Sequence, residues 1–263
     1  EFVLRDENGI IVKLTKESDG NYTYLLNGNN SEEKIKTKNG ALSITHLLSN
    51  KKYYIEEVKA PTGFILPTNV AAPKDKPSKW VWEGHPYVVY NVGVTKPSNE
   101  NQSTTEIISN TPTKVIIHKK DVNTGHLISG KKVTFELYKC GDKACTESRR
   151  SKIYVTKSTL TTDKDGTTYV DSTYVYSKGN QKTDVEITTS SGVVVFRYLP
   201  AAEYGYVLKE TKAPAGFDLP IGLEAETKFF VSGSTVDVDA EVVKNKPSKL
   251  IIRKYSDDGE TLV

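Results

Sequence analysis

The sequence predicts an all-β protein made of sandwiches or open barrels, on three observations. Fifteen tyrosines accompany many threonines and valines, residue types that are typical of strands. Short alternating runs such as VVVFRYL, KFFVSG and TVDVDAEVV recur along the chain, and turn pairs such as NG, DG and SG separate them. Long helical periodicity is absent. Strands with a turn about every ten residues favour sandwiches or barrels over a parallel α/β sheet.

Length and charge narrow the classes of function. At 263 residues the chain is long enough for about two domains, each with its own core. The net charge is only +3, and no block of Lys or Arg alternates with aromatic residues, so we expect no nucleic-acid partner. No apolar run approaches the roughly 18 residues of a membrane span, and the first residues lack a signal-peptide pattern. We therefore expect a soluble excerpt or a processed piece.

One motif occurs twice. The stretch YYIEEVKAPTGFILP (53–67) returns as YVLKETKAPAGFDLP (206–220), with the acid, the Lys-Ala-Pro, the Gly-Phe and the Leu-Pro retained. In a strand with alternating faces, Glu57 and Glu210 point to the same side as the apolar residues of their runs. A carboxylate in a core costs several kcal/mol unless it is protonated, paired or reacting. Both glutamates are therefore candidate functional residues.

Two further repeats place a lysine and an asparagine on inward faces. In KVIIHKKD (114–121) Lys119 is in phase with two apolar residues, whereas Lys120 should point to solvent. KLIIRKYS (249–256) repeats the pattern with Lys254 in the inward position.

The asparagines lie in EIISNTPTK and EVVKNKPSK, where Asn110 and Asn245 are in phase with β-branched residues. A proline two positions later ends each strand.

These motifs divide the chain into residues 1–111, 112–247 and 248–263. The second part is complete, because it holds an inward lysine, glutamate and asparagine in that order. The first part lacks an opening strand with its lysine, since Phe2 is the apparent counterpart of Phe135, which follows the lysine strand of the second part. The third part is the opening strand of a following or complemented domain.

An inward lysine, glutamate and asparagine can react with one another. Burial lowers the pKa of a lysine amine, which is a nucleophile only when neutral, and raises the pKa of a carboxyl, which can then donate to the amide oxygen. The amine attacks the amide, ammonia leaves, and an isopeptide bond remains. The sequence predicts this bond between Lys119 and Asn245, with Glu210 carrying the protons. The reaction needs no cofactor and occurs once, so the chain is not an enzyme for a foreign substrate.

The three motifs resemble those of the collagen-adhesin B-type (CnaB-like) domains of Gram-positive surface proteins and pilins, in which ETKAP.G is the acid-bearing box. The resemblance covers nearly the whole chain, although Val58 replaces the usual threonine of the first box. It implies immunoglobulin-like, prealbumin-like β-sandwiches and an extracellular, wall-linked pilus or adhesin stalk. Neighbouring subunits of the same protein are then the expected partners.

Alternatives remain for both parts of the chain. The inward lysine of the second part could reach solvent at its strand end or form a buried salt bridge without reacting. In the first part, we expect Lys254 of one molecule to dock against Glu57 and Asn110 of the next and form an intermolecular bond. The alternative is that the missing strand was removed by proteolysis or lies outside the numbered residues.

The remaining signals are weaker. Cys140 and Cys145 are either a disulfide or two free thiols. Two insertions interrupt the pattern, one at about 146–190 and one that carries Trp80 and Trp82. Exposed aromatic loops are candidate contacts for a host matrix protein or glycan, which would make the chain an adhesin module, and packing is the alternative role. The four histidines have no metal-like spacing, and DKDGTTYVD lacks the glutamate of a calcium loop, so no metal is expected.

Overall fold

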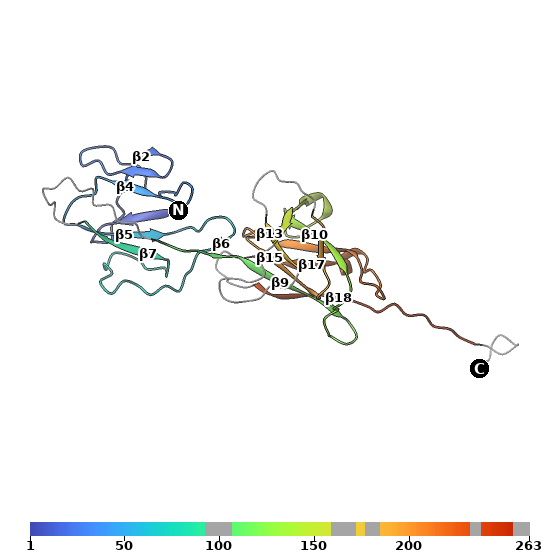
Figure 1. Cartoon of the computed structure of the whole chain (residues 1–263). Coiled ribbons are helices and arrows are strands. Elements are labelled where there is room, and N and C mark those ends of the chain that lie inside the picture. The colour runs from blue at the N-terminus through green and yellow to red at the C-terminus, as the bar shows by residue number, and fades with distance from the viewer. Residues whose placement is uncertain (93–106, 159–171, 177–184, 232–237, 255–263) are drawn as a thin grey trace. The chain divides into compact units, whose positions relative to one another are not determined.

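The computed structural model describes residues 1–92, 107–158, 172–176, 185–231 and 238–254, with the backbone alone for 238–243 (Figure 1). The calcium-loop-like stretch at 163–171 therefore lies outside the described residues. The described chain forms two compact units that separate at Thr113 and Lys114, and the boundary expected from the sequence lies at residues 111 and 112. It contains strands and two short 3₁₀ helices, η1 (Glu147–Arg149) and η2 (Gly222–Ala225), and no α-helix. The predicted all-β class is confirmed.

Unit 1, residues 1–113, contains two three-stranded sheets. Its strands are β1 (Phe2–Arg5), β2 (Thr15–Ser18), β3 (Asn21–Thr23), β4 (Ser43–Thr45), β5 (Lys52–Glu57), β6 (Phe64–Ile65), β7 (Tyr87–Asn91) and β8 (Thr111–Pro112). One sheet has the order β1-β5-β7, the other has the order β2-β3-β4, and β6 pairs with β8. Residues of both sheets share one core, which includes Leu4, Tyr22 and Tyr53.

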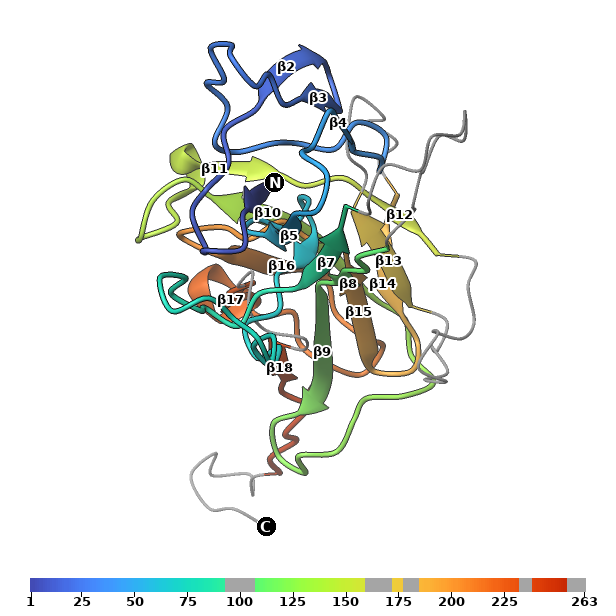
Figure 2. The ribbon, with the colours of Figure 1, turned by 90° about the vertical axis from the view of Figure 1, so that its left-hand side faces the viewer.

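The described residues of unit 2 form two five-stranded sheets. Its strands are β9 (Lys114–Asp121), β10 (Val133–Cys140), β11 (Arg150–Lys152), β12 (Val155–Lys157), β13 (Thr173–Tyr176), β14 (Ile187–Thr189), β15 (Val193–Arg197), β16 (Tyr206–Lys212), β17 (Glu226–Phe229) and β18 (Val238–Asn245). One sheet has the order β11-β10-β16-β17, with β14 also paired to β10. The other has the order β12-β13-β15-β9-β18, and Figure 2 shows β9 between β15 and β18.

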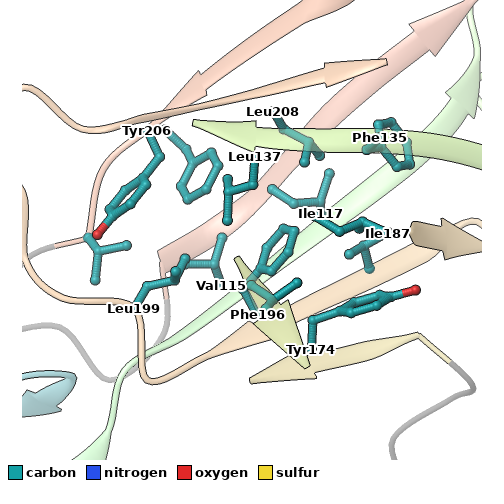
Figure 3. Packing of buried hydrophobic residues seen from close by; sticks show 14 of the residues in the cluster. Val115, Ile117, Phe135, Leu137, Tyr174, Ile187, Phe196, Leu199, Tyr206 and Leu208 are labelled. Carbon is teal, nitrogen blue, oxygen red and sulfur yellow. The ribbon is translucent and has the colours of Figure 1, made fainter. Parts of the chain in front are cut away.

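The core of unit 2 lies between these sheets. Phe135 and Leu137 of β10 and Leu208 of β16 point toward Ile117 of β9 and Phe196 of β15 (Figure 3). All five side chains are buried, because alternate residues of each strand face the opposite sheet. Burial of one such side chain stabilises the fold by about 1.5–3 kcal/mol.

The two units share one strand plan. The antiparallel register of β1 and β5 places Phe2 opposite Glu57, and that of β10 and β16 places Phe135 opposite Glu210. This confirms the predicted correspondence of the two phenylalanines. The parallel pairing of β3 with β4 repeats that of β13 with β15. Unit 2 adds β9 beside β15, and no strand of the described part of unit 1 pairs with β4 on the corresponding side.

Residues 146–190 are not the insertion that the sequence predicts. Their described part supplies β11 and β14 to one sheet and β12 and β13 to the other. The strands are only three or four residues long, which is too short for the alternating pattern to be visible in the sequence. The described part of the segment therefore belongs to the sandwich.

A disulfide joins Cys140, the last residue of β10, to Cys145 after a tight turn, with their Cα atoms 4.8 Å apart. The backbone N–H of Cys145 donates to the Asp142 carboxylate at 2.7 Å, which stabilises the turn. The two sulfur side chains pack on Val207 to form a small cluster separate from the main core.

Candidate functional site

Three polar side chains meet in the interior of unit 2. Lys119 lies on β9, Glu210 on β16 and Asn245 at the end of β18, and their exposed fractions are 1%, 2% and 1%. Alternation explains the inward direction of Lys119, because Val115 and Ile117 on the same face are also buried. The structure therefore brings together the three residues that the sequence predicts for unit 2.

The carboxylate of Glu210 bridges the other two groups. Lys119 Nζ donates to Glu210 Oε2 at 2.8 Å, and Asn245 Nδ2 donates to Glu210 Oε1 at 2.9 Å. One carboxyl group is thus within hydrogen-bonding distance of both the amine and the amide. This is the position that a group must occupy to move a proton between them.

Three hydrogen bonds hold the end of β18 against the loop of the repeated box, residues 216–218. Asn245 Nδ2 donates to the carbonyl of Asp218 at 3.0 Å, and the Asp218 N–H donates to the carbonyl of Lys246 at 2.9 Å. Two residues further, the Ser248 N–H donates to the carbonyl of Gly216 at 3.0 Å. Gly216 has a φ of +84°, a conformation that glycine adopts without strain. This backbone conformation explains why the box has a glycine before its phenylalanine.

Burial lowers the pKa of Lys119, while the hydrogen bond and the charge of Glu210 oppose this effect. Desolvation is the larger cause, so the neutral amine is more accessible here than on an exposed lysine. A neutral amine is the form that attacks an amide carbon.

Asn245 Oδ1 is buried and has no hydrogen-bond partner among the described residues. An acceptor buried in this way costs about 1–3 kcal/mol. Rotation of the amide by half a turn exchanges Oδ1 and Nδ2, and Oδ1 would then accept a hydrogen bond from a protonated Glu210. The unreacted site therefore contains an amide oxygen that only a proton donor such as this carboxyl would satisfy.

Unit 1 holds the acid and the amide of the same arrangement. Glu57 is 1% exposed, and Asn110 Nδ2 donates to its Oε2 at 2.8 Å. Burial raises the pKa of Glu57, although the hydrogen bond from Asn110 and the charge of the N-terminal ammonium lower it. No ion pair between Glu57 and a lysine occurs within the described residues, so this pair has no lysine amine beside it there.

The structure does not form the strand expected after unit 2. Residues 249–254 are exposed and make no strand, and Leu250 and Ile252 are 84% and 83% exposed. Lys254 is exposed at the end of the described chain. The backbone groups of a strand need hydrogen-bond partners on a neighbouring strand. An alternating sequence pattern without such a neighbour therefore does not form a strand.

The aromatic loop of unit 1 buries Trp80 and does not present it on the surface. Trp80 is 1% exposed, its Nε1 donates to Glu56 Oε2 at 3.1 Å, and its ring lies 5.2 Å from that of Tyr54. Trp82 is half-buried and donates to the carbonyl of Val70 at 3.0 Å. An indole gains most by burying its rings while its N–H keeps a partner. A ligand-binding role for these two residues stays a prediction.

Sequence reasoning missed the buried network around Glu56. Its carboxylate accepts from Arg5 Nε at 3.0 Å, from Trp80 Nε1 and from His85 Nδ1 at 3.2 Å. Glu56 is 2% exposed, although its side chain leaves β5 on the opposite face from Glu57. The sequence signal for this network was the presence of one His and two Trp in the inserted loop. These residues cover the face of β5 from which Glu56 points.

The described residues contain no helix long and apolar enough to cross a bilayer. They also contain no group of three or more His, Cys, Asp or Glu side chains that could hold a metal ion. The site is thus formed by a lysine, a glutamate and an asparagine on strands of two packed sheets.

The fold and the site define an all-β architecture with a buried Lys–Glu–Asn cluster. No protein-family profile matches the chain, and no curated protein does. Among solved structures it is similar to GBS52, the minor pilin of Streptococcus agalactiae, with 16% identity and a TM-score of 0.35, over 81% of this chain and 66% of that one. It is also similar to the shaft pilin SpaA of Lactobacillus rhamnosus GG, with 15% identity and a TM-score of 0.35, over 77% of this chain and 66% of that one.

A third similar structure is the Bacillus anthracis TIE protein, with 17% identity and a TM-score of 0.34, over 74% of this chain and 25% of that one. Two of the three proteins are pilins. The chain spans 66% of the length of each of these pilins.

Proposed function

We propose that the chain is part of a structural protein of the Gram-positive cell surface, a wall-anchored pilus or adhesin stalk subunit. In this proposal, unit 2 is stiffened by an isopeptide bond that it makes itself between Lys119 and Asn245. The observation that carries the proposal is the pair of hydrogen bonds that Glu210 makes to the lysine amine and to the asparagine amide.

The reaction balances within the three side chains. The neutral Nζ of Lys119 attacks Cγ of Asn245, and Glu210 polarises the amide by donating a proton to its oxygen. Glu210 then takes a proton from the amine and passes it to the leaving nitrogen, and it recovers its own proton from the oxygen as the carbonyl re-forms. The Cγ–Nδ2 bond breaks, ammonia leaves, and a new Nζ–Cγ amide remains. No oxidant, metal or cofactor takes part.

The position of the bond suits a stalk. β9 and β18 are parallel neighbours, with Val243 paired to Lys119 and Asn245 paired to Asp121. The chain enters unit 2 at the start of β9 and leaves it after the end of β18, so tension along the chain shears these two strands past each other. A covalent bond between them transmits that tension directly, and the rest of the unit carries little of it.

Intact mass under denaturing and reducing conditions tests the proposal. The parent should be lighter than its calculated mass by one ammonia, and Glu210→Ala should regain the full mass because the proton carrier is lost. Lys120→Arg is the matched control, since Lys120 neighbours Lys119 on β9 and should keep the deficit. A parent with its full calculated mass would overturn the proposal.

A further inference from the structure

The loop that follows the acid strand of unit 2 holds the amide of Asn245 from a second side. Nδ2 donates one hydrogen bond to Glu210 Oε1 at 2.9 Å and another to the backbone carbonyl of Asp218 at 3.0 Å. Nδ2 is the nitrogen that leaves in the proposed reaction. This nitrogen therefore has two acceptors, and the second of them lies outside the Lys–Glu–Asn cluster.

The carbonyl of Asp218 favours one orientation of the amide. A carbonyl oxygen accepts hydrogen bonds and donates none, so it attracts Nδ2 and repels Oδ1. Rotation of the amide by half a turn would give up this hydrogen bond. In the resting site, the carbonyl thus keeps the leaving nitrogen of Asn245 directed at the carboxyl of Glu210, which delivers a proton to it in the proposed reaction.

The contact with Asp218 gains importance in the step in which ammonia leaves. Glu210 passes a proton to the leaving nitrogen, and this nitrogen then carries positive charge. A carbonyl dipole that already points at the nitrogen stabilises the charge without reorganisation. Asn245 is 1% exposed, so solvent screens the interaction little.

Ser248 fixes the residue that carries this carbonyl. Ser248 Oγ donates to Asp218 Oδ1 at 2.7 Å, and the Asp218 N–H donates to the carbonyl of Lys246 at 2.9 Å. Two hydrogen bonds from the segment after Asn245 therefore hold Asp218, one to its side chain and one to its backbone. The side chains of Asp218 and Ser248 are exposed, so the core of unit 2 does not depend on them.

Unit 1 provides an internal comparison for this arrangement. The N–H of Thr113 donates to the carbonyl of Gly63 at 2.9 Å, which matches the backbone contact of Ser248 in unit 2. Ile65 occupies the position of Asp218, and the hydroxyl of Thr113 donates to the carbonyl of Gly63 at 3.2 Å. The backbone contact therefore belongs to the repeated box, whereas the hydrogen bond between a hydroxyl and a carboxylate is an addition in unit 2.

We propose that the backbone carbonyl of Asp218 stabilises the leaving nitrogen of Asn245, and that Ser248 is a positioning residue that holds this carbonyl in place. This inference rests on the proposed function and deepens it. The Cγ–Nδ2 bond breaks and ammonia leaves as before, and no atom of Asp218 or Ser248 is transferred. Loss of the Ser248–Asp218 hydrogen bond should therefore slow the reaction without abolishing it.

The rate of ammonia loss in the whole chain tests the proposal. The chain is made by cell-free synthesis, and samples are stopped with acid and denaturant at timed intervals for intact mass measurement. Ser248→Ala should form the bond about 3- to 10-fold more slowly than the parent. Ser248→Thr and Asp218→Asn keep a hydroxyl donor and an oxygen acceptor, so they should react at nearly the parent rate. Lys249→Ala is the matched control, since it changes the exposed neighbour of Ser248.

A second measurement does not depend on the reaction. Lys119→Gln cannot form the bond, and NMR should show slow hydrogen exchange of the Asn245 side-chain amide in this variant. Addition of Ser248→Ala should speed that exchange several-fold, because the Asp218 carbonyl is then held less firmly.

The proposal is overturned if Ser248→Ala reacts at the parent rate, or if its addition to Lys119→Gln leaves the exchange unchanged. A parent that never loses ammonia contradicts the proposed function instead, and the exchange measurement then tests the positioning role by itself.

Discussion

Lys119 and Glu210 form an ion pair in the interior of unit 2, with Nζ and Oε2 2.8 Å apart and the side chains 1% and 0% exposed. A buried pair is a weak source of stability, because the desolvation of two charges offsets most of their attraction. Well-packed apolar residues in place of the ion pair would stabilise the core at least as much. The chemical role proposed for the pair with Asn245 gives a reason for its presence that stability alone does not.

Loss of the bond should lower the stability of unit 2 strongly. Asn245→Ala removes the amide and reopens a loop of about 126 residues, for which the chain-entropy estimate is roughly 5 kcal/mol. The Tm of unit 2 should fall by about 15–20 °C in scanning calorimetry. Lys120→Arg should melt like the parent. An Asn245→Ala protein with the Tm of the parent would mean that no bond constrains the unfolded chain.

The same variant should show a new pH dependence. Burial lowers the pKa of Lys119 below its ordinary 10.5, so between the lowered value and 10.5 the unfolded state binds more protons than the folded state. The free energy of unfolding of Asn245→Ala should therefore rise with pH through this window, and fall as the pH decreases through it.

In the linked parent, Lys119 is an amide that does not titrate, so urea titrations at several alkaline pH values should give a flatter profile. The double variant Asn245→Ala, Lys119→Gln is the control and should also lose the additional slope. Equal slopes in the parent and in Asn245→Ala would contradict a reacted lysine.

Removal of the Glu56 carboxylate should loosen the aromatic loop of unit 1. Glu56→Ala leaves Arg5 Nε and Trp80 Nε1 without their acceptor in a buried site, at a cost of about 3–5 kcal/mol. Trypsin should then cleave after the exposed Lys79 faster than in the parent. Glu83→Ala removes a carboxylate that is 66% exposed and should leave the cleavage rate nearly unchanged. Equal cleavage rates in both variants would contradict a stabilising role of Glu56 in the loop.

The disulfide should matter less than the isopeptide bond. Cys140 and Cys145 are five residues apart, and the chain-entropy estimate for so short a loop is about 2 kcal/mol. A reductant should therefore lower the Tm of unit 2 by less than Asn245→Ala does, and the double Cys→Ser variant should remove the response to reductant. A larger decrease in Tm with reductant than in Asn245→Ala would contradict this prediction.

The sequence predicts the site of unit 2 because strand alternation is strict. Once a strand contains Val115 and Ile117 on one face, Lys119 must share that face, and the same holds for Glu210 with its neighbours. The repeated box gives the register as well, which places Phe2 and Phe135 opposite equivalent glutamates.

Alternation does not reveal what covers the outer face of a strand. Glu56 follows the pattern of a solvent-facing residue, yet the loop with Trp80 and His85 buries it. Likewise, the strands within 146–190 are too short to show a period, so the sequence could not distinguish them from an insertion. Tertiary contacts decide both cases.

A tryptic digest of the parent, analysed by tandem mass spectrometry, tests the central claim most directly. Reacted Lys119 resists trypsin, and Lys246 precedes a proline, so the bond should appear as peptide 115–120 joined to peptide 245–249. The joined mass should equal the sum of the two peptides less one ammonia, with fragments that assign the link to Lys119 and Asn245. Cleavage after Lys119, together with a free, unmodified 245–249 peptide, would contradict the claim.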